Sequence, residues 1–240
     1  SLKSINIPES VEQFETGVFA GSSLESIRIS CNYSLFRYDS MDNCTSLKTL
    51  IFYGDGPIKS DDRSILSCFQ PIIYNAIIEE NITKIGKNIF QNFRNLISVT
   101  IPDSVTVING YAFQNCYSLK SITLPINLAI ISIGTFDNCS SLASLKISEN
   151  VEQINNSIPS TLKIICAFRN CKSLTTVTIP EGVKTIGVYV FDNCTSLQSI
   201  NIHVGIKSIG QHSFDNCPLL HELNIYGVGI LNTTSDMIFE

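Results

Sequence analysis

The tetrapeptide Phe-Asp-Asn-Cys occurs three times, in FDNCSSLASL (136–145), FDNCTSLQSI (191–200) and FDNCPLLHEL (214–223). In each copy a leucine follows the cysteine by three positions. Three reactive thiols, three metal ligands or three copies of one structural unit would all give this pattern. The spacing of the surrounding residues decides between these possibilities.

Phenylalanine marks a repeat of 23 residues. Phe90, Phe113 and Phe136 are 23 residues apart, and Phe168, Phe191 and Phe214 continue the series after a longer interval. Aligned on these markers, the unit reads F-x-N-C-x-S-L-x-S-I-x-I-P-x-x-V-x-x-I-G. A period of this length that contains L-x-x-I-x-I and an N-C pair is typical of leucine-rich repeats. The FDNC copies are therefore repeats of one structural unit.

Three segments of the repeat also resemble a known family. LKSITLP (119–125), VKTIGVYVF (183–191) and FDNCTSL (191–197) are similar to the BspA-like (Treponema-type) leucine-rich repeat surface proteins. The in-register copies cover nearly the whole chain. They depart from the pattern between 54 and 75 and between 155 and 163.

The alternation in L-x-x-I-x-I predicts one short strand per unit, and V-x-x-I-G predicts a second. We expect Leu119, Ile122 and Leu124 to point inward, and Lys120, Ser121 and Thr123 to point outward. The fold class is therefore a β-rich α/β repeat, a leucine-rich repeat solenoid of about ten units with a parallel β-sheet on its concave face. We expect a single domain over 1–240, irregular around 54–67 and 155–163, that is a piece of a longer array.

Stacking turns the cysteines of the unit into a column. Side chains in register lie about 4.8 Å apart and point in parallel, whereas a disulfide needs Cβ atoms about 3.8 Å apart on converging bonds. We therefore expect buried, reduced thiols with a structural role, and Phe93 occupies the same position in one unit. The state of Cys31, Cys68 and Cys166, which lie off the column, stays open. The column members are Cys44, Cys116, Cys139, Cys171, Cys194 and Cys217.

Composition and motifs argue against most chemistry. A net charge of −5 removes a general basic footprint for nucleic acid, and no apolar run approaches the ~20 residues that span a bilayer. The three histidines fall in different columns, and no C-x-x-C spacing for zinc occurs. We therefore predict no catalytic residues, no metal site, no cofactor and no membrane insertion by this segment.

The outward strand positions are the expected binding surface, because solenoids commonly bind partners through their exposed strands. This surface is rich in Ser and Thr with scattered Lys and Arg, and Ser and Thr are also simply well suited to an exposed strand. The predicted partner-binding residues are Arg28, Lys48, Lys120, Thr123, Lys146, Thr178, Asn201 and Asn224.

The resemblance implies a surface-exposed adhesion or recognition protein that contacts a protein partner, such as a host protein or an extracellular matrix glycoprotein. An intracellular scaffold or regulator is the alternative, because nine cysteines without an evident pairing fit a reducing compartment. A structural spacer stalk is a third reading. The sequence names neither the partner nor the oligomeric state.

Overall fold

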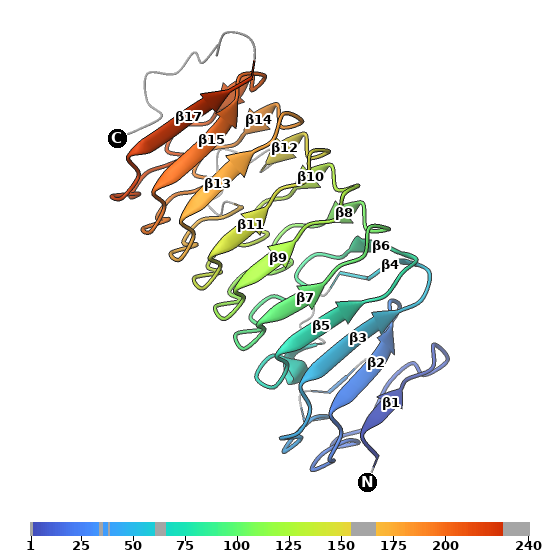
Figure 1. Cartoon of the computed structure of the whole chain (residues 1–240). Helices are drawn as coiled ribbons and strands as arrows, with labels where there is room; N and C mark the ends of the chain where they lie inside the picture. Colours follow the sequence, from blue (N-terminus) through green and yellow to red (C-terminus); the bar gives the residue numbers. More distant parts are fainter. Residues whose placement is uncertain (1, 34–35, 38, 61–65, 155–166, 228–240) are drawn as a thin grey trace.

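Ten short parallel strands lie side by side along the front of the molecule (Figure 1). The computed structural model describes residues 2–33, 36–37, 39–60, 66–154 and 167–227. β1 and β17 lie at opposite ends of the stack (Figure 1). The front strands are β1 (Ser4–Asn6), β2 (Ser26–Ser30), β3 (Thr49–Tyr53), β5 (Asn75–Ile78), β7 (Ser98–Thr100), β9 (Ser121–Thr123), β11 (Ser144–Lys146), β13 (Thr176–Ile179), β15 (Ser199–His203) and β17 (Glu222–Tyr226).

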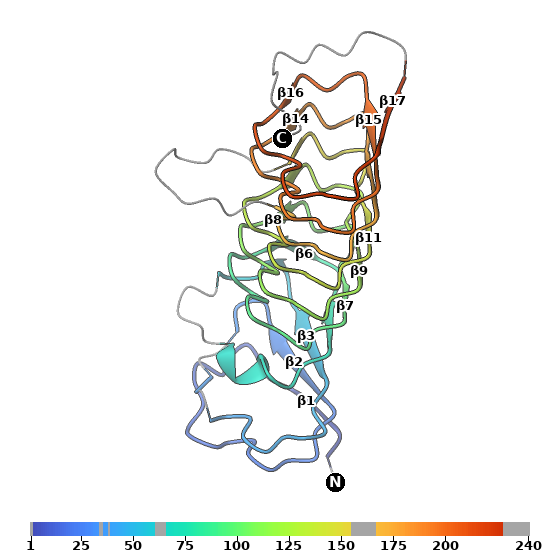
Figure 2. The ribbon, with the colours of Figure 1, turned by 90° about the vertical axis from the view of Figure 1, so that its left-hand side faces the viewer.

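A second row of shorter parallel strands lies on the other side of the stack (Figure 2). Its members pair in one sheet of order β16-β14-β12-β10-β8-β6-β4. Each turn of the chain therefore contributes a front strand and, over most of the array, a back strand. The back strands are β4 (Gly56–Pro57), β6 (Ile82–Ile85), β8 (Val107–Ile108), β10 (Ile130–Ile131), β12 (Gln153–Ile154), β14 (Thr185–Ile186) and β16 (Ser208–Ile209).

This architecture is the predicted β-rich leucine-rich repeat solenoid. Among the described residues there is one helix, the 3-10 turn η1 (Ser67–Phe69). β3 pairs directly with β5, and Ile51 lies opposite Ile77, so the stack is continuous across the first irregular segment. Residues 61–65 and 155–166, which include most of the second irregular segment, lie outside the described part of the chain.

Alternation of apolar and polar residues produces the front strands. In β9, Ile122 is buried while Ser121 and Thr123 are exposed, and Leu119 and Leu124 are also buried, as predicted. Parallel pairing in register places like residues above one another, for example Val177 opposite Ile200. Each turn buries its apolar edge against its neighbours, which is where a solenoid gains its stability.

The marker phenylalanines form a continuous stack inside the solenoid. From Phe90 to Phe214, successive ring centroids are 5.1–5.6 Å apart and their planes agree within 3–9°. All but Phe214, which is 3% exposed, are fully buried. The stack fixes one corner of every turn, because each ring packs on both neighbours.

The asparagine before each cysteine has a backbone role that the sequence analysis missed. The residue adopts a left-handed conformation in every turn, with φ of 62° at both Asn115 and Asn138. Asn tolerates this region better than most residues with a side chain. The side-chain amides also bond to one another: Nδ2 of Asn138 donates to Oδ1 of Asn115 at 2.9 Å, and Asn115 donates to Asn92 at 2.8 Å. The tight corner therefore requires Asn for two reasons.

The cysteine column is a ladder of free thiols. The Sγ–H of Cys139 donates to the carbonyl of Phe113 at 3.2 Å, and Cys116 and Cys194 bond in the same way to Phe90 and Phe168. Burial raises the pKa of Cys116, Cys139, Cys171 and Cys194 well above the ordinary thiol value, and that of half-buried Cys217 to about 11. All cysteines among the described residues are unpaired, including Cys31 and Cys68; Cys166 lies outside that part of the chain. The prediction of structural thiols is confirmed for the column.

Candidate functional site

The outward side chains of the ten front strands form one surface, which we call the strand face; it is the surface that the sequence analysis expected to be concave. The eight predicted binding residues all lie on it, but they are spread along its whole length. Arg28, Thr123, Lys146, Thr178, Asn201 and Asn224 occupy one register column, and Lys48 and Lys120 lie just before β3 and β9. The structure brings together Thr123 with Lys146, and Thr178 with Asn201 and Asn224.

The structure adds one rung to the strand face that the sequence analysis did not resolve. Tyr74 and Ile77 belong to the turn of β5 and fill the gaps in the columns of Lys48 and Ile51. The signal was present in the segment YNAII (74–78), where Ala76 stands in place of the usual Ile. Extra residues between Gly54 and Ser67 shifted the period and hid it.

Apolar side chains gather in the middle of the strand face. Ile51 lies opposite Ile77, and the N–H of Ile97 bonds to the carbonyl of Tyr74, so these four residues lie on three adjacent turns. Ile77 is 36% exposed and Ile97 is 37% exposed, while Ile51 and Tyr74 are half-buried. We call Ile51, Tyr74, Ile77 and Ile97 the central patch. Aromatic and aliphatic residues that stay exposed on a polar surface are candidates for the core of an interface.

Arg28 is held by its own neighbours. Its guanidinium donates to both carboxylate oxygens of Glu79, at 2.7 and 2.5 Å, and to Asn6 at 3.0 Å, and it lies 3.9 Å from the ring centre of Tyr53. The hydrogen bond from Arg28 lowers the pKa of Glu79, and the same bond raises the pKa of Arg28. A partner would have to displace these contacts, so Arg28 is a weaker binding candidate than its exposure in the sequence pattern indicated.

The three lysines of the strand face differ from Arg28. Lys48, Lys120 and Lys146 are exposed, and within the part of the chain that the structure describes none of them is ion-paired with a carboxylate. The ammonium of Lys48 lies 4.7 Å from the ring centre of Tyr74, which holds it beside the central patch. These cations remain available to an anionic partner.

The strand face from β13 to β17 is bonded to itself. The amide of Asn201 donates to Thr178 at 3.0 Å, and the amide of Asn224 donates to Asn201 at 3.0 Å. Ser199 donates to Thr176 at 3.1 Å in the neighbouring column. The polar side chains of this region already satisfy one another, which reduces what they can offer to a partner.

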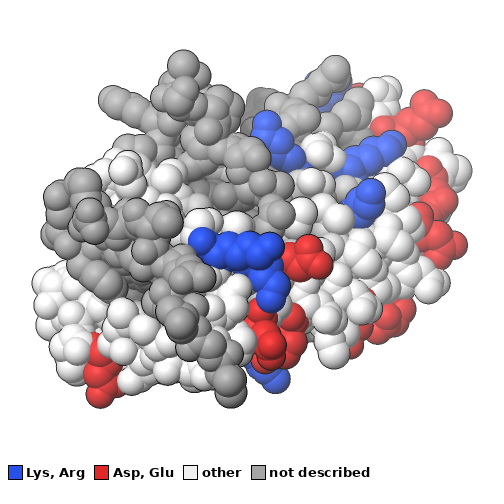
Figure 3. All heavy atoms as spheres, turned by 90° about the horizontal axis from the view of Figure 1, so that it is seen from above, with Lys and Arg blue, Asp and Glu red and all other residues white. Residues whose placement is uncertain are grey.

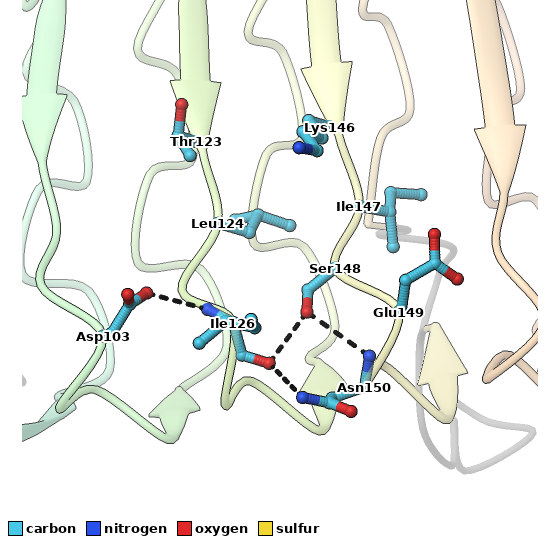
Figure 4. Close-up of a pocket in the computed structure, with 9 residues that line it drawn as sticks. All are labelled: Asp103, Thr123, Leu124, Ile126, Lys146, Ile147, Ser148, Glu149 and Asn150. Atoms are coloured by element: carbon cyan, nitrogen blue, oxygen red, sulfur yellow. Dashed lines mark hydrogen bonds between the residues drawn. The ribbon is translucent and has the colours of Figure 1, made fainter.

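A hollow of about 400 Å³ lies where β9 and β11 end (Figure 4). Leu124 and Ile147 line it, with Thr123 and Lys146 along the strands. Its polar wall is internally bonded: Asp103 accepts from the N–H of Ile126, whose carbonyl accepts from Ser148 at 2.8 Å and Asn150 at 2.7 Å (Figure 4). The hollow extends the strand face over its edge.

Carboxylates gather along the edge where the front strands end, as the view down the array shows (Figure 3). The corner after each front strand often carries an exposed acidic residue. These residues include Glu9, Glu80, Asp103, Glu149 and Glu181. The negative charge of the chain is therefore concentrated away from the lysines of the strand face.

Other chemistry finds little support in the described part of the molecule. Three or more potential metal-binding side chains do not come together anywhere among the described residues. Nor do these residues include a helix with the length and apolar character needed to cross a membrane. His212 is engaged with Asp215 at 2.8 Å, and His203 accepts from the N–H of Gly205 at 3.0 Å.

Comparisons with known proteins agree with this fold. A family model for the BspA type leucine rich repeat region matches in six copies, over residues 1–70, 66–165 and 155–240. A leucine-rich repeat protein of Treponema pallidum superposes with a TM-score of 0.63, at 20% identity over 90% of this chain and 91% of that one. A leucine-rich repeat protein of Bacteroides ovatus gives 0.54, at 22% identity over 93% of this chain and 69% of the other. No curated protein matches the sequence closely enough to count as a relative.

Proposed function

Because the chain belongs to the BspA-type leucine-rich repeat family, we propose that it is a non-catalytic domain that binds a protein partner through the strand face. The central patch is the observation that supports this proposal most strongly. It is apolar, exposed and flanked by cations on a surface that is otherwise small and polar. Buried aromatic and aliphatic anchors with a polar rim are what stable protein interfaces use.

The setting that we propose is the cell surface or the extracellular space, with a host protein or an extracellular matrix glycoprotein as the partner. An extended sheet surface suits such a partner, because weak contacts repeated along it add up through multivalency. The eight residues predicted from the sequence mark the length of this surface, and the central patch is its strongest part.

One observation favours a second candidate, an intracellular scaffold. Every described cysteine is a free thiol, and the column cysteines use their S–H groups as donors inside the solenoid. Such a ladder requires reduced cysteines, which a reducing compartment maintains. Burial of the thiols would also protect them in an oxidising compartment, since only the thiolate reacts.

The surface setting is tested on intact source cells with an antibody and an added protease. Rapid loss of the protein before lysis supports the surface proposal. Full protection until lysis rejects it and leaves the intracellular scaffold.

Use of the strand face is tested separately with the triple variant Lys48→Glu, Lys120→Glu, Lys146→Glu. We expect reduced binding to a reconstituted extracellular matrix with the fold unchanged. The matched control reverses Lys84, Lys184 and Lys207, which lie in or beside the back strands and change the net charge equally. Equal binding by the two triple variants would reject the strand face as the binding surface.

A further inference from the structure

The central patch is bounded by a lysine at each end along one column of the strand face. Backbone bonds fix the order: Tyr74 donates to the carbonyl of Lys48 at 2.9 Å, Ile97 to Tyr74 at 2.7 Å, and Lys120 to Ile97 at 3.3 Å. Four adjacent turns therefore present Lys, Tyr, Ile and Lys in sequence. Ile51 and Ile77 lie two residues further along two of the same turns and widen the apolar part.

The charge around the patch has one sign. The nearer acidic groups of the strand face are engaged, because Glu25 is ion-paired with Lys3 and Glu79 with Arg28. Lys48 and Lys120 remain without a carboxylate among the described residues. The chain as a whole carries −5, so this positive region is contrary to the overall charge. Such complementarity selects the sign of a partner and steers its approach.

We propose that the central patch binds an extended acidic protein segment that carries an apolar side chain between two carboxylates. This proposal rests on the proposed function and names the chemistry of the partner. The carboxylates pair with Lys48 and Lys120, and the apolar side chain packs on Tyr74 and Ile97. The segment lies across the strands, along the axis of the array.

The turn spacing sets the pattern of that segment. Strands lie about 4.8 Å apart, so three intervals from the turn of Lys48 to that of Lys120 span about 14 Å. An extended chain covers this distance in about four residues, at roughly 3.3–3.6 Å per residue. The expected motif is therefore Glu or Asp at positions i and i+4 with a Leu or Phe between them.

An acidic segment with no apolar residue would satisfy the lysines and leave the exposed isoleucines in water. An apolar segment with basic flanks would meet repulsion from Lys48 and Lys120. The combination of the two features is what selects the acidic and apolar segment.

The test uses a fluorescent twelve-residue peptide with a central Glu-Ser-Leu-Ser-Glu and Gly-Ser flanks, titrated with the whole chain by fluorescence anisotropy. Three companion peptides replace both Glu by Lys, Leu by Ser, or each Glu by Gln. We expect binding of the parent peptide that weakens with salt, and binding at least about tenfold weaker for each companion. Equal binding of the Lys peptide would overturn the proposal.

Variants locate the site. Lys48→Glu with Lys120→Glu is expected to weaken binding of the parent peptide by about tenfold or more, and Tyr74→Ala by a similar factor. The control Lys84→Glu with Lys207→Glu carries the same charge change on the back strands and is expected to bind normally. Unchanged urea midpoints show that each variant is folded, and equal loss in both double variants would contradict the assignment.

The two proposals fail separately. If the triple variant described above loses binding to matrix while the parent peptide binds no better than the Lys peptide, the strand face binds a partner of another chemistry. If matrix binding survives the triple variant, the strand face itself is rejected.

Discussion

The turns of β1 to β7 and the turns of β9 to β17 are built by different means. In the second group, which we call the regular half, successive marker rings from Phe113 to Phe214 stack with planes within 3–6° of one another. In the first group, the irregular half, Phe36 meets Phe69 at 73° and Phe52 meets Phe90 at 84°. Edge-on packing accommodates turns of unequal length, whereas parallel stacking requires an unchanged repeat.

The strand face differs in the same way. Polar side chains of the regular half bond to one another across β13, β15 and β17. The irregular half exposes the central patch and pairs its cations with aromatic rings, as Arg28 does with Tyr53 and Lys48 with Tyr74. Regular repetition thus satisfies the surface internally, and departures from it leave groups that can contact a partner. We infer that stability and binding are concentrated in different parts of the array.

The largest expected effect comes from breaking the ring stack of the regular half. Phe136→Ala removes a fully buried ring that lies 5.4 Å from each of two neighbours, and should lower the free energy of unfolding by about 3–5 kcal/mol. Urea denaturation followed by circular dichroism measures the change. The exposed Lys120→Ala is the control, with an expected change within about 0.5 kcal/mol. Similar losses in the two variants would show that the stack contributes little.

The asparagine corner should give the next largest effect. Asn138→Ala removes a side-chain bond and places Ala at a φ of 62°, so we expect a loss of about 2 kcal/mol. Asn138→Gly removes the same bond but adopts this φ without strain, so its loss should be about 1 kcal/mol. Equal losses would mean that the left-handed backbone is not what selects Asn.

A dependence on pH should follow from the thiol ladder. Burial raises the pKa of Cys139 above that of the same thiol in the unfolded chain. The stabilisation is therefore fully present below the unfolded value of about 8.5 and is lost as the pH rises above it. Urea midpoints at pH 7.5 and 9.5 should converge between the native protein and Cys139→Ala by about 1 kcal/mol at the higher pH. If the two proteins lose stability in parallel, the thiol of Cys139 is not buried in its neutral form.

The smallest effect on stability is expected at the central patch. Ile77→Thr changes an exposed strand residue, so the free energy of unfolding should stay within about 0.5 kcal/mol. Binding of the parent acidic peptide should nevertheless fall several-fold. The comparison variant Asn201→Ala, in the same register column of the regular half, should bind this peptide normally. A reversed outcome would place the binding surface in the regular half.

The sequence predicts the regular half well and the irregular half poorly, for physical reasons. A fixed period of 23 residues determines which side chains stack, so the inward positions of β9 and the buried cysteines follow from pattern alone. The left-handed Asn corner was missed because several roles of Asn look alike in a sequence. Tyr74 and Ile77 were missed because the chain length between Gly54 and Ser67 altered the period without breaking the stack. The engagement of Arg28 by Glu79 joins residues 51 positions apart, which no local pattern reveals.

Lysine footprinting with an amine-reactive reagent, with and without the parent acidic peptide, tests the central claim most directly. Mass spectrometry reports the modification of each lysine, so the two sides of the array are compared in one sample. Protection of Lys48 and Lys120, with Lys84 and Lys207 modified as before, is the predicted result. Equal protection of all four lysines, or protection of the back lysines alone, would contradict a binding surface centred on the irregular half.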